Sequence, residues 1–286
     1  MNFQEIDYNK RDIFWNKYFE ITKIYYSRPD CIRNSDCENN RRYLLHHQNT
    51  IIGTVLIFEN SVFYWTMLEC YDYTIQEQIK IIERLCDNQK ITIKAENWMN
   101  YHVISSGYKI LFSQMFMLMS LEDDKKENNL DRLDYPRITE ENIEEIAEIM
   151  LDGYKDTIDE KIYTNGFGYD FDKEKENIMK LMTNEQEELI FFPDASIGIK
   201  ESSEDLIGVC LVAFWGKIPY IYDIAVRKNF QGKGYGKKLL IKAISIIKKR
   251  GYNQVCLFVT EGNPAQKLYE KIGFKESDYF FSFFSK

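Results

Sequence analysis

The sequence predicts an α/β protein with mixed sheets flanked by helices, arranged as two domains of the same kind. Strand-like alternation and helix-like periodicity of apolar residues succeed one another along the whole chain. The 286 residues exceed the roughly 100 to 200 residues of a single domain. A charged run without periodicity, Asp123–Asn129, interrupts the pattern. We therefore expect a first domain at residues 1–120, a linker at 121–137 and a second domain at 138–286.

The first domain is expected to begin with an amphipathic helix within its first 24 residues. Two apolar runs on either side of Gln48-Asn49 predict a hairpin. Strands and helices then alternate. The expected elements are strands at 41–47, 50–58 and 61–68, a helix at 75–85, a strand at 91–95, a helix at 97–105 and a strand at 113–119.

In the second domain, Thr139 is of a residue type that favours an N-cap, so a helix is expected after it. Residues 154–171 contain glycines and aromatic residues and are expected to form a long ordered loop, which is often functional. The remaining expected elements are a helix at 173–182, strands at 189–192, 197–200, 206–214 and 220–226, a helix from Gly236 that stops at Gly251, a strand at 254–260, a helix at 263–272 and a strand at 279–285.

A glycine-rich segment, Gln231–Lys237, joins a predicted strand to a predicted helix. The first amides of a helix lack carbonyl partners and, together with the helix dipole, attract an anion. Glycines let the backbone approach a phosphate and adopt positive φ. This segment does not match a P-loop, because it has Gln231 in place of the first glycine and Lys238 in place of the serine or threonine. The dinucleotide fingerprint also fails, since Gly236 comes one residue early.

The segment resembles the coenzyme A loop of the GNAT acetyltransferases, whose pattern is Arg/Gln-x-x-Gly-x-Gly/Ala after a strand. Gln231, Gly234 and Gly236 match that pattern. Asn263–Phe274, with the sequence Asn-Pro-Ala-Gln-Lys-Leu-Tyr-Glu-Lys-Ile-Gly-Phe, resembles the family's second signature. The family's usual proline after the strand is Lys228 here. The resemblance implies acetyl-CoA as co-substrate and transfer of its acetyl group to an amine.

The same resemblance implies the coenzyme-binding residues. The strand backbone would pair with the pantetheine arm, and the loop amides would hold the pyrophosphate. Asn263 would contact the arm, although its place before Pro264 fits a helix N-cap equally well. The complete expected set is Ile224, Ala225, Val226, Gln231, Gly232, Lys233, Gly234, Tyr235, Gly236, Lys237, Asn263 and Tyr269.

Four residues are expected to take part in catalysis. The resemblance implies that the Val226 amide stabilises an oxyanion and that Tyr269 protonates the leaving thiolate. A phenol with a pKa near 10 is protonated at neutral pH and can donate, but Tyr269 also fits a core aromatic. Asp223 and Glu261 each end or occupy a strand beside the loop, so either could be the general base or a salt-bridge partner.

The two halves repeat several landmarks. Gly53 precedes Gly208 by 155 residues, so the second copy has eleven more residues before its last helix, and we place them at the glycine loop. The first copy has no glycine there, and Val103 stands where Tyr269 would be expected. A degenerate first copy without a cofactor loop is therefore expected, with coincidence of a common α/β pattern as the alternative. The pairs 166 residues apart are Asn97 and Asn263, Gly107 and Gly273, and Tyr108 and Phe274.

Composition and charge limit the classes of binding partner that we expect. A net charge of −8 argues against nucleic acid, and no apolar run of about 18 residues indicates a membrane span. The polar start and six scattered cysteines predict a cytoplasmic protein without a metal. Residues 136–205 carry 7 basic and 20 acidic residues, whereas 206–286 carry 14 and 5. This gradient fits an anionic coenzyme held by the basic part and a cationic acceptor near the acidic part, or simply a solvated surface.

We therefore expect an acetyl-CoA-dependent N-acetyltransferase that acts by direct attack of a primary amine, belonging to a small cationic molecule or a peptide. One alternative is a non-catalytic acyl-CoA-binding regulatory module. Another is a two-domain transferase for longer acyl or aminoacyl groups. The sequence leaves the acceptor and the oligomeric state open.

Overall fold

The structure is a computed structural model that describes residues 1–22, 40–58, 61–87, 91–122, 133–167, 170–185, 189–201 and 205–286. The chain divides into two compact units, Met1–Gln114 together with Asp278–Lys286, and Met115–Ser277. The sequence placed the last nine residues in the second domain, whereas the structure places them in the first unit. The reason is that Phe281–Ser285 pairs antiparallel with β5 of that unit.

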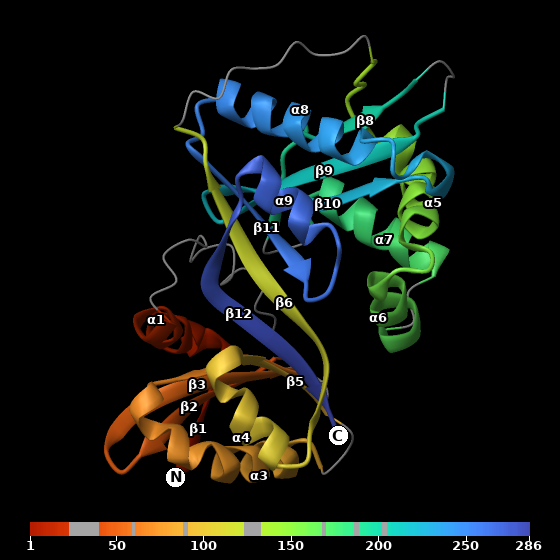
Figure 1. Cartoon of the computed structure of the whole chain (residues 1–286). Helices are drawn as coiled ribbons and strands as arrows, with labels where there is room; N and C mark the ends of the chain where they lie inside the picture. Colours follow the sequence, from red (N-terminus) through yellow and green to blue (C-terminus); the bar gives the residue numbers. More distant parts are fainter. Residues whose placement is uncertain are drawn as a thin grey trace. The chain divides into compact units, whose positions relative to one another are not determined.

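In the first unit, strands are ordered β1-β2-β3-β4-β5-β12-β6 (Figure 1). Helix α1 covers one face through Phe14, Trp15 and Tyr18, and α3 and α4 cover the other. The short strand β1 was not predicted because most of its side chains are exposed and show no apolar alternation. The elements are β1 (Asn2–Ile6), α1 (Arg11–Thr22), β2 (Arg41–His47), β3 (Thr50–Phe58), β4 (Ser61–Met67), α3 (Ile75–Leu85), β5 (Thr92–Glu96), α4 (Asn100–Ser105) and β6 (Lys109–Ser120).

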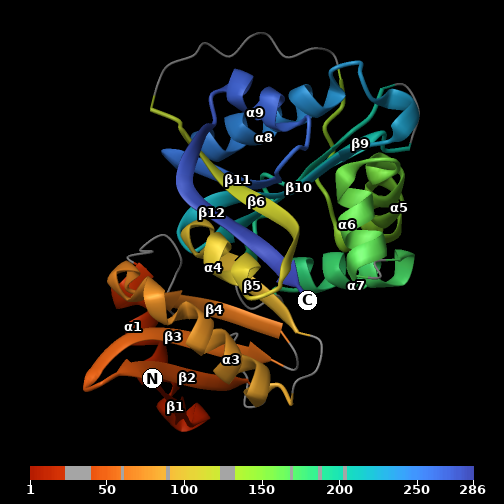
Figure 2. The ribbon, with the colours of Figure 1, turned by 60° about the horizontal axis from the view of Figure 1, so that its bottom comes forward.

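The second unit has strands in the order β6-β11-β10-β9-β7, and β8 also pairs with β9. Helix α8 packs on one face of this sheet and α5 and α7 on the other (Figures 1 and 2). The elements are α5 (Ile143–Tyr154), α6 (Ile158–Phe167), α7 (Phe171–Met182), β7 (Leu189–Phe191), β8 (Ile197–Ile199), β9 (Gly208–Trp215), β10 (Ile218–Val226), α8 (Tyr235–Lys249), β11 (Gln254–Thr260) and α9 (Gln266–Ile272). Strand β12 (Lys275–Ser285) begins in this unit and continues into the first.

The expected loop at 154–171 was wrong, because α6 occupies most of it. Helix α6 begins where the Glu160 N–H donates to Thr157 Oγ1 at 3.3 Å, and the Asp156 N–H donates to Glu160 Oε2 at 2.6 Å. This is close to a capping box, whose Thr-x-x-Glu pattern was present in the sequence. By contrast, the expected cap at Thr139 is confirmed, with a capping box to Asn142.

Strands β10 and β11 run parallel but pair only over Tyr220↔Cys256 and Ile221↔Leu257 in the described register. Strand β10 then changes register against β9 between Ile221 and Asp223, which leaves Tyr222 as an extra residue. A bulge of this kind bends its strand. The C-terminal half of β10 is therefore paired with β9 alone.

The two units share an order of elements. Strands β2, β3 and β4 are antiparallel and β4 is parallel to β5, just as β8, β9 and β10 are antiparallel and β10 is parallel to β11. Gly53 lies opposite Met67 as Gly208 lies opposite Val226. A Cβ at Gly53 would lie 2.4 Å from the Thr66 carbonyl oxygen, and one at Gly208 would lie 2.9 Å from that of Ala225. Both positions thus require glycine.

The eleven additional residues of the second half are spread over several elements. Val226 follows Gly208 by 18 residues, whereas Met67 follows Gly53 by 14, so four of them lengthen the hairpin. The connection from β10 to α8 is only one residue longer than that from β4 to α3. The expectation that the difference falls at the glycine loop was therefore wrong in the main, since strand and helix length account for more of it.

The described ends of the expected linker lie within the second unit, and residues 123–132 fall outside the described part of the chain. The Leu121 N–H donates to the Asn253 carbonyl at 2.8 Å, and Asp134 and Arg137 form bridges to Lys200 and Ile197.

Two further findings concern metals and membranes. Within the described ranges, no group of three His, Cys, Asp or Glu is placed to hold a metal ion, and no helix has the length and hydropathy that a membrane crossing requires. Cys210 and Cys256 are buried in the core, as their strand positions predict.

Candidate active site

The glycine loop has the conformation that its sequence predicts. Gly232 and Gly234 have φ values of +75° and +86°, in the region that residues with a Cβ rarely adopt. Gly234 is the N-cap of α8, so the first amides of a 15-residue helix begin directly after it. Among the described residues, an added Cβ at either glycine would meet nothing within 4 Å. The space beside the Cα atoms of these two glycines is therefore open.

Gly236 has a different role from the other two glycines. It lies inside α8, where glycine costs about 1 kcal/mol relative to alanine. A Cβ there would meet only Val226 Cγ2, at an ordinary contact distance of 3.8 Å. No described atom of the protein would thus exclude a side chain at this position. A glycine here instead suits a ligand that approaches the backbone closely.

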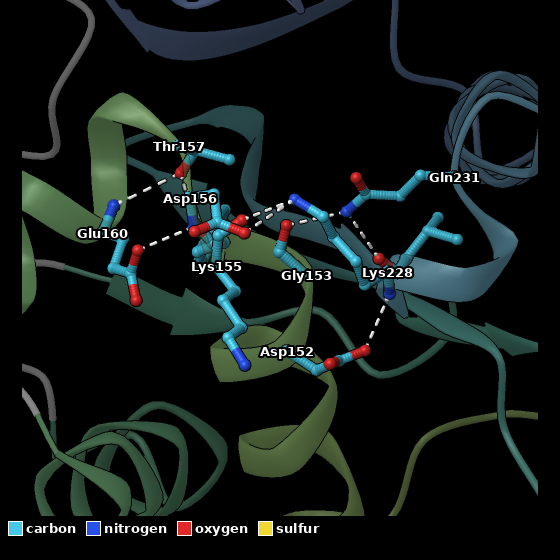
Figure 3. Close-up of polar contacts among 10 residues, drawn as sticks. Asp152, Gly153, Lys155, Asp156, Thr157, Glu160, Lys228 and Gln231 are labelled. Carbon is cyan, nitrogen blue, oxygen red and sulfur yellow. Dashed lines mark hydrogen bonds and ion pairs between the residues drawn. The ribbon is translucent and has the colours of Figure 1, made fainter.

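The side chain of Gln231 holds the loop in place. Its Nε2 atom donates to the Gly153 carbonyl at 2.7 Å and to the Val226 carbonyl at 2.9 Å (Figure 3). One amide group thereby joins the end of α5, the end of β10 and the start of the loop. Gln231 is expected beside the pyrophosphate, and in the structure its side-chain amide is bonded to these two carbonyls.

Lys228, which stands where the family usually has proline, also joins this region to α5 and to the turn that follows α5. Its backbone N–H donates to Asp152 Oδ2 at 2.7 Å, and its Nζ atom donates to the Lys155 carbonyl at 2.8 Å and lies 3.5 Å from Asp156 Oδ2 (Figure 3). A proline could not make the first of these bonds.

The backbone of β10 presents alternate residues to its free edge. The Arg227 N–H donates to the Ile207 carbonyl at 2.9 Å, so Arg227 and Ala225 face β9. Ile224 and Val226 therefore face the opposite side, which β11 has left. The Ile224 N–H donates to Asp223 Oδ1 at 2.7 Å. Of the three expected backbone contacts to a pantetheine arm, Ala225 is thus engaged within the sheet. The Val226 amide faces the edge of β10, at Ile224 and Val226, that β11 does not pair; we call this edge the opening.

Asp223 is a partly buried carboxylate beside that opening. It accepts hydrogen bonds at Oδ1 from the Tyr154 hydroxyl and from the Ile224 N–H. Burial raises the pKa of Asp223 to about 7, although the Ile224 bond opposes the rise. Its carboxylate can therefore both hold and release a proton near neutral pH.

Tyr269 is a titratable group close enough to Asp223 to feel its charge, as is Tyr154, which bonds to it. Its side chain is buried in the core below α8, where its ring contacts Phe274 at a centroid distance of 6.0 Å. Burial first, and then the charge of Asp223, raise the pKa of Tyr269 far above its usual value. The phenol therefore keeps its proton at neutral pH, as a general acid must, while its core packing also fits the structural interpretation.

Asn263 lies in a turn before α9 and is held from two sides. Its Oδ1 atom accepts the Ala265 N–H at 2.8 Å, and its Nδ2 atom donates to Asp159 Oδ2 at 2.6 Å. Asp159 is 6% exposed and its Oδ1 atom also accepts the Thr260 hydroxyl at 2.8 Å. Helix α9 begins at Gln266 rather than at Asn263, so Asn263 caps the turn that leads into the helix.

The remaining expected residues lie around the loop. Glu261 is exposed at the end of β11. Lys233 is exposed, with its Nζ atom 5.1 Å from the ring centre of Phe230, and Lys237 is exposed on the first turn of α8. Tyr235 is 7% exposed and its hydroxyl donates to Glu201, so its side chain supports the loop from below.

These residues fit a coenzyme with a pyrophosphate group. Open space lies beside the Cα atoms of Gly232 and Gly234, exposed lysines flank it, and the edge of β10 that β11 does not pair leads from the loop toward Asp223. Amides, a helix N-terminus and lysines are the donor set that phosphate oxygens require.

Sequence reasoning did not identify Tyr154, Asp159 or Thr260. Tyr154 and Asp159 contact the site residues Asp223 and Asn263, which lie 69 and 104 residues away in the chain. Thr260 contacts Asp159, 101 residues away. Tyr154 was among the aromatic residues of the expected loop, and Asp159 stands in the first turn of α6, where acidic residues are common. Nothing local distinguished them.

Comparison with known proteins matches this part of the chain to one family. Residues 160–274 match the Acetyltransferase (GNAT) family. The [ribosomal protein bS18]-alanine N-acetyltransferase of Haemophilus influenzae is 47% identical over 58 residues, which are 20% of this chain and 40% of that protein. The mycothiol acetyltransferase of Streptosporangium roseum is 41% identical over 59 residues, 20% of this chain and 18% of that protein. The chain thus spans two fifths or less of the length of these relatives.

Solved structures resemble the fold over the whole chain. A tandem GNAT protein from the clavulanic acid biosynthesis pathway has a TM-score of 0.68 at 8% identity, covering 100% of this chain and 98% of its own. A GNAT-family acetyltransferase from Colwellia psychrerythraea has a TM-score of 0.60 at 12% identity, covering 100% and 99%. At such identities the likeness concerns the fold alone.

Proposed function

We propose that this protein transfers an acetyl group from acetyl-CoA to a primary amine of a small cationic molecule or a peptide, because residues 160–274 match the GNAT acetyltransferase family. The observation that most supports this is the open space beside Gly232 and Gly234 at the N-terminus of α8, next to the edge of β10 that β11 does not pair and that contains Asp223.

The coenzyme, when bound, supplies the acetyl group as an activated thioester. The amides from Gly232 to Lys237 bind its pyrophosphate, and Lys233 and Lys237 add positive charge. Val226 directs its N–H toward the thioester carbonyl, where a preorganised donor can contribute roughly 3 kcal/mol to transition-state stabilisation.

Asp223 acts as the general base and takes a proton from the acceptor amine, directly or through water. A pKa near 7 suits this role, because the group is then partly deprotonated at neutral pH and still a good acceptor. Glu261 is exposed to solvent and lacks such an environment, so we place it second. Tyr269 donates its proton to the departing thiolate.

Two kinds of acceptor amine are consistent with the site. The acidic residues of α5 and α6 favour a cationic amine. The name of the Haemophilus influenzae relative refers to the alanine of a ribosomal protein, which supports a peptide amine. The name of the Streptosporangium roseum relative refers to mycothiol, which supports a small molecule.

The test is release of free thiol from acetyl-CoA in the presence of single amines. Suitable probes are a peptide with N-terminal alanine, a lysine peptide, spermidine and glucosamine. We expect amine-dependent thiol release and a mass increase of the acceptor by one acetyl group. Saturable coenzyme A binding without thiol release for any amine would contradict the proposal and favour the non-catalytic acyl-CoA-binding module. Faster thiol release from longer acyl-CoA donors than from acetyl-CoA would favour a two-domain transferase for longer acyl groups.

A further inference from the structure

Asp159 of α6 is buried and uses both carboxylate oxygens. Oδ1 accepts the Thr260 hydroxyl at 2.8 Å and Oδ2 accepts the Asn263 amide at 2.6 Å. Thr260 ends β11, and Asn263 begins the turn into α9. The carboxylate thus joins α6 to the segment on the β11 side of the opening.

The orientation of the Asn263 amide is determined by these contacts. The Ala265 N–H needs an acceptor and therefore faces Oδ1, which turns Nδ2 toward Asp159. Without Asp159, nothing in this set of bonds would stop the Asn263 side chain from rotating away while its carbonyl kept the Ala265 bond. The Nδ2 group of Asn263 has two N–H bonds, and one of them is bound by Asp159. Asp159 thereby also fixes the direction of the other N–H.

Ile158, in the first turn of α6, lies next to the same turn. Gly262 has a φ of +85°, and a Cβ added there would lie 3.7 Å from Ile158 Cδ1. The first turn of α6 is therefore adjacent to the turn between Thr260 and Asn263, and the two bonds of Asp159 join them.

We infer that Asp159 is a positioning residue, which orients Asn263 toward the coenzyme arm and couples coenzyme binding to the first turn of α6. The inference rests on the proposed function, because it takes coenzyme A as the ligand that Asn263 contacts. It assigns to α6 a role in coenzyme binding although none of its residues belongs to the loop. Coenzyme binding should then reduce the local opening of α6, because Asn263, one of the two partners of Asp159, becomes fixed.

The first test is hydrogen exchange of residues 157–162 with and without coenzyme A. We expect slower exchange in the wild-type protein with coenzyme A, and no slowing in Asp159→Ala. Asp170→Ala is the matched control, since Asp170 caps the neighbouring helix α7 through the Lys173 N–H at 3.0 Å and is exposed. The control should keep the slowing. Asp159→Asn should keep it too, because an amide oxygen can accept from Asn263 while its NH2 group donates to Thr260.

The second test is a double-mutant cycle on the dissociation constant of coenzyme A. Asp159→Ala should raise that constant at least about fivefold in the wild-type background and less than about twofold in Asn263→Ala, since residues that act through one another are not additive. If Asp159→Ala does not fold, Asp159→Glu displaces the carboxylate and replaces it in the cycle.

The outcomes separate the two proposals. Additive effects, or unchanged exchange of α6 in a wild-type protein that binds coenzyme A, would overturn the role of Asp159 and leave the proposed function intact. A wild-type protein that does not bind coenzyme A at all would overturn both.

Discussion

The hydroxyl of Tyr154, at the end of α5, donates a hydrogen bond to Oδ1 of Asp223 on β10. The same oxygen accepts the Ile224 N–H, so the carboxylate is fixed in one orientation. Its second oxygen takes part in neither bond. This arrangement places a carboxylate with a pKa near 7 where β10 and β11 separate.

The first prediction concerns the pH dependence of catalysis. A general base acts when deprotonated, so kcat/KM should rise with pH through an apparent pKa near 7 and level off above it. Asp223→Asn should lower kcat/KM by about 10²-fold to 10³-fold and remove this inflection. Steady-state rates from pH 5.5 to 9 with one acceptor would measure both. An inflection that survives in Asp223→Asn but disappears in Glu261→Gln would assign the base to Glu261 instead.

The second prediction concerns stability. The folded pKa of Asp223 is raised above its unfolded value of 3.8, so the folded state binds the proton more tightly. Its stabilising contribution is complete below pH 4 and is lost as pH rises through about 7. A shift of this size corresponds to at most about 4 kcal/mol, and partial solvent access reduces it. Urea unfolding should therefore show Asp223→Asn gaining stability over the wild type between pH 4 and pH 8. A constant difference over that range would contradict the shift.

The third prediction separates catalysis from packing at Tyr269. Tyr269→Phe keeps the buried ring and its contact with Phe274 but removes the proton donor. We expect kcat to fall about 10²-fold, with the unfolding midpoint nearly unchanged. Stopped-time product assays and thermal unfolding would measure the two effects. A variant with full kcat would show that Tyr269 serves the core only.

The fourth prediction tests Gln231 as a support of the loop. Gln231→Leu leaves the Gly153 and Val226 carbonyls without their donor, which should cost about 1 to 3 kcal/mol and weaken coenzyme A binding. Gln266→Leu is the control, because it removes two bonds to exposed carboxylates of Glu270 and Glu276 and should change stability little. Equal losses in the two variants would argue against a special role for Gln231.

The sequence was sufficient for the glycine loop because its signals are local. The alternation in β10, the glycines at positive φ and the periodicity of α8 all lie within about thirty residues. The strand β11 was predicted at its observed bounds, Gln254–Thr260, for the same reason.

The sequence was insufficient where tertiary contacts decide. Asp223 and Glu261 were equivalent as strand carboxylates, and only burial distinguishes them. Helix α6 was missed because its aromatic and glycine content outweighed a capping pattern of four residues. The sequence near β12 does not indicate that its last residues belong to the first unit. That placement depends on the pairing of β12 with β5, a strand almost two hundred residues earlier.

The account rests on binding of a coenzyme by the loop amides, and calorimetric titration of coenzyme A into a matched pair of glycine variants tests this most directly. Gly234 and Gly251 lie at opposite ends of α8 with the same φ of +86°, and an added Cβ meets nothing within 4 Å at either. Gly234→Glu and Gly251→Glu should therefore pay a similar conformational cost of about 1 to 2 kcal/mol. We predict that Gly234→Glu abolishes binding whereas Gly251→Glu binds like the wild type. Equal affinity of the two variants would contradict the account.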